Sequence, residues 1–168
     1  ADANDNAIDI TISALAASSD SGIYVSETDG LTVTTVAAVT VDIESVVRVN
    51  FNSTTNDVSE DRTASSLEDL STDTDGPVKL VSLAGSLTIE GGSDGLGVSA
   101  NGAGDVLIEA RGAGSDVIID ADVVSGTGNI TLDAANDLTV NAAVWTGGSG
   151  TRYRVAGSKI AGNDSVTT

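Results

Sequence analysis

The 168-residue chain contains no cysteine, no histidine and no methionine. Without cysteine it can form neither a disulfide framework nor a thiolate metal site. Without histidine it lacks the commonest general base and the commonest transition-metal ligand. These absences exclude zinc hydrolases and catalysis by Ser-His-Asp or Cys-His arrangements.

Aromatic residues are scarce: the chain has only Tyr24, Phe51, Trp145 and Tyr153. Most helical domains and sandwiches fill their cores partly with aromatic rings. Here valine, isoleucine, leucine and alanine must form the core instead. Such small side chains suit a thin core inside a narrow stack of strands.

Positive charge is also scarce, with 7 basic residues against 25 acidic ones and a net charge of −18. Nucleic-acid binding depends on lysine and arginine at phosphates, so we predict no nucleic-acid partner. An anionic membrane surface would repel the chain, and no apolar run approaches the length of about 20 residues that spans a bilayer. Cations and basic partners remain attractive.

Apolar residues alternate with other residues in short bursts, which is typical of strands with one buried face. These bursts are Ile8 to Ile12, Ile23 to Val25, Leu31 to Val33, Val39 to Ile43, Val47 to Phe51, Val78 to Leu80, Leu87 to Ile89, Leu96 to Val98, Val106 to Ile108, Val117 to Ile119, Ile130 to Leu132 and Leu138 to Val140.

One phrase, apolar-x-apolar-x-Ala, recurs five times and ends at Ala100, Ala110, Ala121, Ala134 and Ala142. We interpret each copy as one rung of a stack. Pairs of spacings between bursts total roughly 16 to 24 residues, which predicts coils of two or three strands. The sequence therefore predicts an all-β protein, a parallel β-solenoid. The alternative is an antiparallel β-sandwich, because Asp29–Gly30 and Asn101–Gly102 are hairpin signals.

We expect a single β domain over residues 1–168, with an acidic insertion at 52–77 and a basic C-terminal tail at 151–168. Within the insertion, Ser65 followed by Glu68 predicts one short helical turn. The tail carries Arg152, Arg154 and Lys159, which would either dock onto the next molecule or form a frayed end. Because the chain begins at Ala1, we expect a processed protein or a piece of a longer one.

The phrases "GNITLDAANDLTVNA", "DVLIEA" and "DVIIDA" resemble the repeat region of filamentous-haemagglutinin-type exoproteins and related large bacterial surface adhesins. The resemblance covers Gly85 to Val144, and Ala7 to Phe51 in pattern only. It implies a right-handed parallel β-helix that acts as a long stalk, and an extracellular or cell-surface location. The acidic insertion departs from an uninterrupted stalk.

Two aspartates are candidate calcium ligands, because calcium prefers several hard oxygen donors. Asp105 and Asp116 each follow a Gly-x-Gly turn, in "NGAGDVLIE" and "RGAGSDVII". The alternative is that both side chains cap their turns. A different pair, Glu109 and Asp120, could supply the two carboxyls that glycoside hydrolysis needs, or simply be solvated acids.

We therefore expect a non-enzymatic structural or adhesive module, with no catalytic and no cofactor-binding residues and with calcium as the one candidate ion. Its partners would be other copies of itself, neighbouring repeats of a larger chain, a host surface or a glycan. The first alternative is a self-assembling subunit of an extracellular filament or sheath, because the end of a solenoid is a template for pairing. The second is a polysaccharide-active β-helix enzyme, which the shortage of aromatic and basic residues disfavours.

Overall fold

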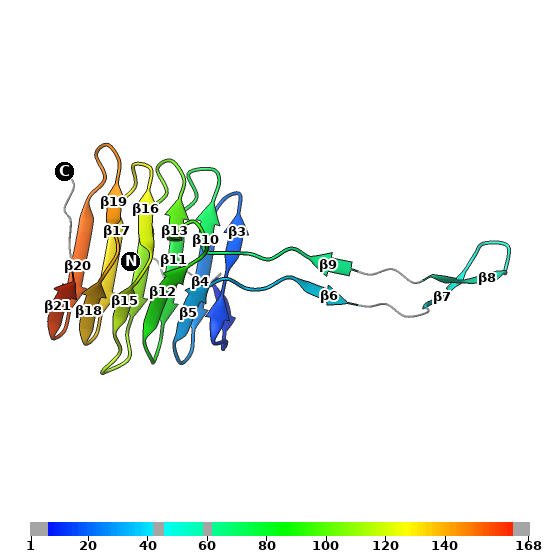
Figure 1. Ribbon diagram of the computed structural model, residues 1–168, viewed down its shortest axis with the longest axis horizontal. Coiled ribbons are helices and arrows are strands. Elements are labelled where there is room, and N and C mark those ends of the chain that lie inside the picture. Colours follow the sequence, from blue (N-terminus) through cyan, green and yellow to red (C-terminus); the bar gives the residue numbers. More distant parts are fainter. Residues whose placement is uncertain (1–6, 42–45, 59–61, 163–168) are drawn as a thin grey trace. The chain divides into compact units, whose positions relative to one another are not determined.

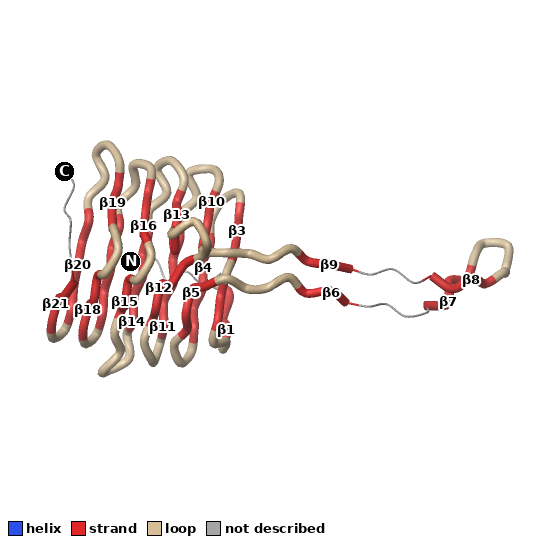
Figure 2. The backbone as a smooth tube through the Cα atoms, viewed as in Figure 1, coloured by secondary structure: helices blue, strands red, loops and turns tan. Residues whose placement is uncertain are grey.

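The computed structural model describes residues 7–41, 46–58 and 62–162. Within these ranges the chain forms strands and turns and no helix (Figure 2). The described residues therefore offer no helical segment with the length and hydrophobicity needed to cross a membrane. The chain divides into two compact units, one built from Ala1–Val36 and Glu68–Thr168 and the other from Ala37–Leu67.

The first unit is a parallel β-solenoid with three sheets, which we call A, B and C (Figure 1). Every strand pair within these sheets is parallel, as in β4 with β11 and β15 with β18. Sheet A contains β1 (Ile8–Ile10), β4 (Ile23–Glu27), β11 (Val78–Ser82), β14 (Val106–Ala110), β17 (Ile130–Ala134) and β20 (Arg152–Ala156). Sheet B contains β2 (Ala14–Leu15), β5 (Leu31–Thr34), β12 (Leu87–Gly91), β15 (Val117–Ile119), β18 (Asp137–Val140) and β21 (Lys159–Gly162). Sheet C contains β3 (Ala17–Ser19), β10 (Leu70–Thr72), β13 (Leu96–Ala100), β16 (Asp122–Ser125) and β19 (Val144–Thr146).

The predicted solenoid is thus confirmed and the alternative sandwich is wrong. Asp29 and Gly30 lie in the turn from β4 to β5, which belong to two different parallel sheets. Asn101 and Gly102 likewise connect β13 in sheet C with β14 in sheet A. Glycine-containing turns serve the corners of a solenoid as well as hairpins, so these dipeptides could not distinguish the two folds.

Each complete rung contributes one strand to each sheet. Residues paired between successive rungs are 28, 24 and 22 positions apart, from Val78 to Val106, to Ile130 and to Arg152. The repeated phrase therefore marks one strand and not one rung, which corrects the interpretation above. "ITLDA" is β17 in sheet A and "LTVNA" begins in β18 in sheet B, whereas the partner of Ile130–Ala134 in the preceding rung is Val106–Ala110.

The core consists of columns of aliphatic side chains that stack from rung to rung. In sheet A, Val25, Leu80, Ile108 and Leu132 occupy one column, and the last three are fully buried. Ala110 and Ala134 pair at the C-terminal ends of β14 and β17 in the same sheet and are also buried. Because each rung buries its apolar face mainly against its two neighbours, stability comes from the stacking itself.

The corner between sheets C and A requires glycine, because the backbones of successive rungs meet there. A Cβ on Gly128 would lie 2.3 Å from the carbonyl oxygen of Gly104, and a Cβ on Gly104 would lie 2.3 Å from that of Gly76. The buried Ser125 hydroxyl joins the same two turns: it donates to the Gly104 carbonyl at 2.8 Å and accepts from the Gly128 N–H at 2.9 Å. A side chain at Gly104 or Gly128 would therefore clash with the backbone of the preceding rung.

The second unit, which we call the hairpin insertion (residues 37–67), enters the sequence between β5 and β10. Its strands β6 (Val39–Val41) and β9 (Arg62–Ala64) pair antiparallel, as do β7 (Val46–Val49) and β8 (Thr55–Val58). The connection from β7 to β8 is ordered by a bond of 2.8 Å from the Asn50 N–H to the Thr54 carbonyl.

Three expectations about this region are corrected. The bursts of residues 39–43 and 47–51 do not form solenoid strands, because their described residues pair within the hairpin insertion; Ile43 lies outside the described residues. The inserted unit spans residues 37–67, not 52–77, since Leu70–Thr72 is β10 of sheet C. Ser65 to Glu68 forms no helical turn. An alternating pattern specifies a strand, not its partner, which explains the first error.

The basic C-terminal segment forms strands of the last rung. Arg152–Ala156 pairs with β17, and Lys159–Gly162 pairs with β18. Arg152 and Arg154 take the register positions that Ile130 and Leu132 occupy one rung earlier, and both are half-buried. Residues 163–168 of the predicted tail lie outside the described residues.

Candidate functional site

The two predicted calcium ligands connect successive rungs of the solenoid. Asp105 Oδ1 accepts hydrogen bonds from the backbone N–H of Asn129 at 2.7 Å and from its Nδ2 at 3.2 Å. Asp116 Oδ1 accepts from Asn136 Nδ2 at 2.8 Å and from the Asp137 N–H at 3.0 Å. Among the described residues neither belongs to a group of three acids with closely spaced oxygens. One oxygen of each thus joins its own turn to the next rung rather than capping that turn, and calcium binding there stays a prediction.

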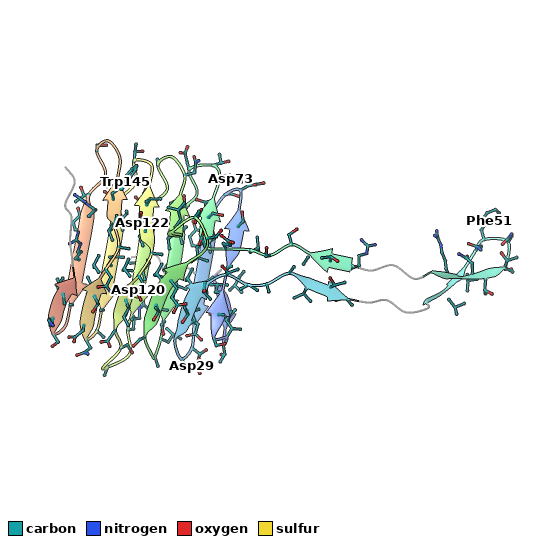
Figure 3. The ribbon with its side chains drawn as sticks, viewed as in Figure 1. Asp29, Phe51, Asp73, Asp120, Asp122 and Trp145 are labelled. Carbon is teal, nitrogen blue, oxygen red and sulfur yellow. The ribbon has the colours of Figure 1, made fainter. Side chains whose placement is uncertain are left out.

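The structure does not place Glu109 and Asp120 on one sheet. Glu109 lies in β14 of sheet A, where both its oxygens accept from Arg111, at 2.7 Å and 2.9 Å. Asp120 directly follows β15 of sheet B and accepts from Asn141 Nδ2 at 2.7 Å (Figure 3). The Arg111 guanidinium has a raised pKa, because it donates to Glu109. Each of these carboxylates is therefore already engaged with a neighbouring side chain.

A cluster of three acids lies where the chain enters β10; we call it the acidic cluster (Glu68, Asp69 and Asp94). One carboxylate oxygen of each lies within 4.8 Å of the other two. Glu68 Oε2 accepts from the Ser93 N–H at 2.8 Å and from the Ser93 hydroxyl at 2.9 Å. A Cβ on Gly92 would lie 2.3 Å from that oxygen, so glycine is needed for the approach.

Asp69 is the buried member of the acidic cluster, with 7% of its surface exposed. Burial, together with the negative charge of Asp94, raises its pKa from the ordinary value of 3.8 to about 6. Sequence reasoning missed this cluster, because Asp94 is distant in the sequence from Glu68 and Asp69. The pairing of Leu70 with Val98 brings the residue before β10 beside the turn before β13.

The outer face of sheet A carries a shallow groove that contains both tyrosines of the chain. Tyr24, Lys79, Leu107, Thr131 and Tyr153 follow one another in register across five successive strands. They line a hollow of about 390 Å³. Both tyrosines are substantially exposed, at 39% and 54%. We call this surface the sheet A groove.

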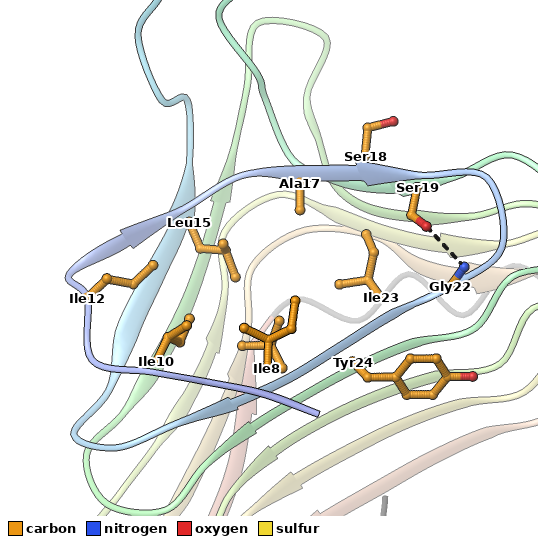
Figure 4. A pocket seen from close by; sticks show the side chains of 11 residues that line it. Ile8, Ile10, Ile12, Leu15, Ala17, Ser18, Ser19, Gly22, Ile23 and Tyr24 are labelled. Carbon is orange, nitrogen blue, oxygen red and sulfur yellow. Dashed lines mark hydrogen bonds between the residues drawn. The ribbon is translucent and has the colours of Figure 1, made fainter. Parts of the chain in front are cut away.

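The N-terminal end of the solenoid is apolar. Ile8, Ile10, Ile12, Leu15 and Ile23 are among the residues that line a hollow of about 340 Å³ within the first rung (Figure 4). Ile8 is 65% exposed. The opposite end is mixed: the half-buried Arg152 there donates to the Val144 carbonyl at 3.0 Å, and Ile160, which continues the column of Leu138, is 52% exposed. The two ends of the solenoid therefore differ in chemistry.

The turn of the hairpin insertion exposes Phe51 completely (Figure 3). Ser53 adopts a φ of 63°, and the Thr54 hydroxyl donates to Asn52 Oδ1 at 2.6 Å. Val47 and Val49 of β7 are 58% and 70% exposed. The turn and β7 thus expose three apolar side chains of this unit, in a segment whose other turn residues are polar.

Comparisons with known proteins returned no matching family model, no matching curated protein and no matching solved structure. The resemblance to filamentous-haemagglutinin-type stalks therefore stays a prediction.

Proposed function

We propose that this chain is a non-enzymatic, extracellular structural or adhesive module of a bacterial-type surface protein, and that the sheet A groove is its adhesive surface. The observation that supports this proposal is the ladder from Tyr24 to Tyr153, which sets two exposed rings at the ends of one outward-facing row. Four strand spacings separate the rings, a distance of about 19 Å. That length suits an extended oligomeric ligand better than a single small molecule.

A neutral glycan is the ligand class that fits this groove best. Tyrosine offers an apolar ring for a sugar face and a hydroxyl for its edge. Lys79, Asp105, Asn129 and Thr131 supply polar groups along the groove. The chain's net charge of −18 opposes acidic polysaccharides, so neutral chains are favoured.

Glycan-array binding of the purified chain tests this proposal, with neutral and acidic oligosaccharides compared side by side. We expect binding to neutral oligomers that Tyr153→Ala weakens several-fold. Trp145→Ala is the matched control, because Trp145 is an aromatic residue of similar exposure in β19 of sheet C. That variant should bind like the unmodified chain.

Two results would contradict the proposal. Absence of binding to any glycan would remove the ligand class, and equal loss in both aromatic variants would remove the sheet A groove as the site. Release of new reducing ends from a bound polysaccharide would instead support the enzyme alternative.

The filament alternative has one supporting observation, the exposed apolar end around Ile8. The arginines of the last rung oppose direct head-to-tail stacking, since inward-pointing charges discourage pairing at a sheet edge. Electron microscopy of the chain tests this alternative. Regular filaments that Ile8→Lys abolishes and Leu83→Lys preserves would favour it, while dispersed particles would count against it.

A further inference from the structure

We propose that Glu68, Asp69 and Asp94 form a binding site for a divalent cation, with calcium as its ligand. The sequence analysis did not identify this acidic cluster from its residue types or their spacing. The cluster is separate from the sheet A groove. The site would join the segment before β10 to the turn between β12 (Leu87–Gly91) and β13 (Leu96–Ala100).

The observation that points to a ligand is the buried, unpartnered oxygen of Asp69. Its side chain is more than nine-tenths buried, and Asp69 Oδ1 has no hydrogen-bond partner among the described residues. A buried carboxylate oxygen without a partner is costly, because it has lost its water and gained nothing in return. A bound cation would satisfy that oxygen directly.

The surroundings of Asp69 increase this need. Asp94 and Glu68, the charged neighbours that raise its pKa, are both acids. Three negative groups within 4.8 Å of one another repel, unless positive charge is bound between them. A divalent cation supplies that charge at the centre of the group.

Calcium matches the donor set and its dimensions. It binds six to eight oxygens at about 2.3–2.6 Å in flexible geometry, so two oxygens on one ion lie at most about 5 Å apart. The separations in the acidic cluster fall within that limit. Asp94 is exposed and Glu68 is half-buried, so water can complete the coordination shell. Magnesium demands stricter octahedral geometry and dehydrates reluctantly.

A proton is the competing occupant of Asp69. Below a pH of about 6 protonation would neutralise the group and leave less charge for a cation. The experiment must therefore be carried out near neutral pH or above, where Asp69 is ionised.

Isothermal titration calorimetry of the full chain with calcium chloride tests the proposal, after chelator treatment and at physiological salt. We expect one saturable site above the weak background of an acidic protein. Asp69→Asn should weaken binding at that site at least about tenfold, because calcium affinity depends on the number of charged ligands. Asp94→Asn, an exposed position, provides a second variant if Asp69→Asn changes the circular dichroism spectrum.

Two control variants define specificity. Asp116→Asn removes one of the two sequence-predicted candidates, and Asp9→Asn removes an exposed acid of β1. Both should keep the saturable site. Absence of saturable binding would overturn the proposal, as would unchanged binding in Asp69→Asn and Asp94→Asn. Loss of binding in Asp116→Asn alone would assign the calcium site to the turn that contains Asp116, and this would also overturn the proposal. Magnesium chloride in place of calcium should give weaker binding; equal affinity would overturn the choice of calcium.

Discussion

Replacing Gly128 with alanine tests the close approach of successive rungs at the corner between sheets C and A. The new Cβ would lie 2.3 Å from the Gly104 carbonyl oxygen and 2.5 Å from the Gly104 carbonyl carbon. Real Cβ atoms do not approach backbone so closely, so one of the two turns must move. Both turns are held by the buried Ser125 hydroxyl, so movement breaks at least one of its two hydrogen bonds.

The expected cost follows from those bonds. A buried polar group that loses its partner costs about 1–3 kcal/mol, and shifting a packed backbone adds to this. The alanine also lowers the entropy of the unfolded chain, which returns about 0.4–1 kcal/mol. We therefore expect Gly128→Ala to lower the free energy of unfolding by about 2–4 kcal/mol.

Urea unfolding followed by far-ultraviolet circular dichroism measures this change. Gly114→Ala is the control: its Cβ would meet nothing within 4 Å, but its φ is 81°. That variant should be destabilised only by the cost of about 1–2 kcal/mol that alanine has in the left-handed region, reduced by the same entropic gain. If Gly128→Ala costs no more than Gly114→Ala, close approach of the rungs does not limit this corner.

Two further predictions concern the core and the acidic cluster. Leu132→Ala should cost about 2–5 kcal/mol in urea unfolding, because Leu132 is fully buried between rungs, whereas Leu83→Ala, half exposed, should cost far less; similar losses would contradict the stacked core. In chelator-treated buffer the folded state binds the Asp69 proton more tightly than the unfolded chain, since the pKa is raised from 3.8 to about 6. The free energy of unfolding should therefore decrease by about 3 kcal/mol, relative to Asp69→Asn, as the pH rises from about 4 to about 6. Parallel pH curves of the two proteins would refute this.

The solenoid was predictable because its signal is local and repeated. Ile130 and Leu132 alternate with polar residues, as do Leu138 and Val140, and both of these bursts form strands of parallel sheets. The positions of individual strands within a rung were not predictable. Similar phrases occur in two different sheets of one rung. Only the strand pairing between rungs shows whether two phrases lie in the same rung or in successive rungs.

The last rung shows how register overrides pattern. In "RYRVA" the apolar residues Tyr153 and Val155 alternate with Arg152 and Arg154, so the pattern favours burial of the former pair. The ladder with β17 places the arginines in the inward columns instead. A shift of one residue exchanges the faces of a strand, and the preceding rung decides the register.

The sequence by itself determined that this chain is an all-β stack with an aliphatic core, because period-two alternation and small turn residues act over a few neighbouring positions. Only the tertiary structure decided which bursts stack and which form the hairpin insertion, since pairing depends on partners far away in the chain. It also decided the candidate sites. The ladder that aligns Tyr24 with Tyr153 and the register that brings Asp94 beside Asp69 both arise from stacking over many residues, which no local pattern encodes.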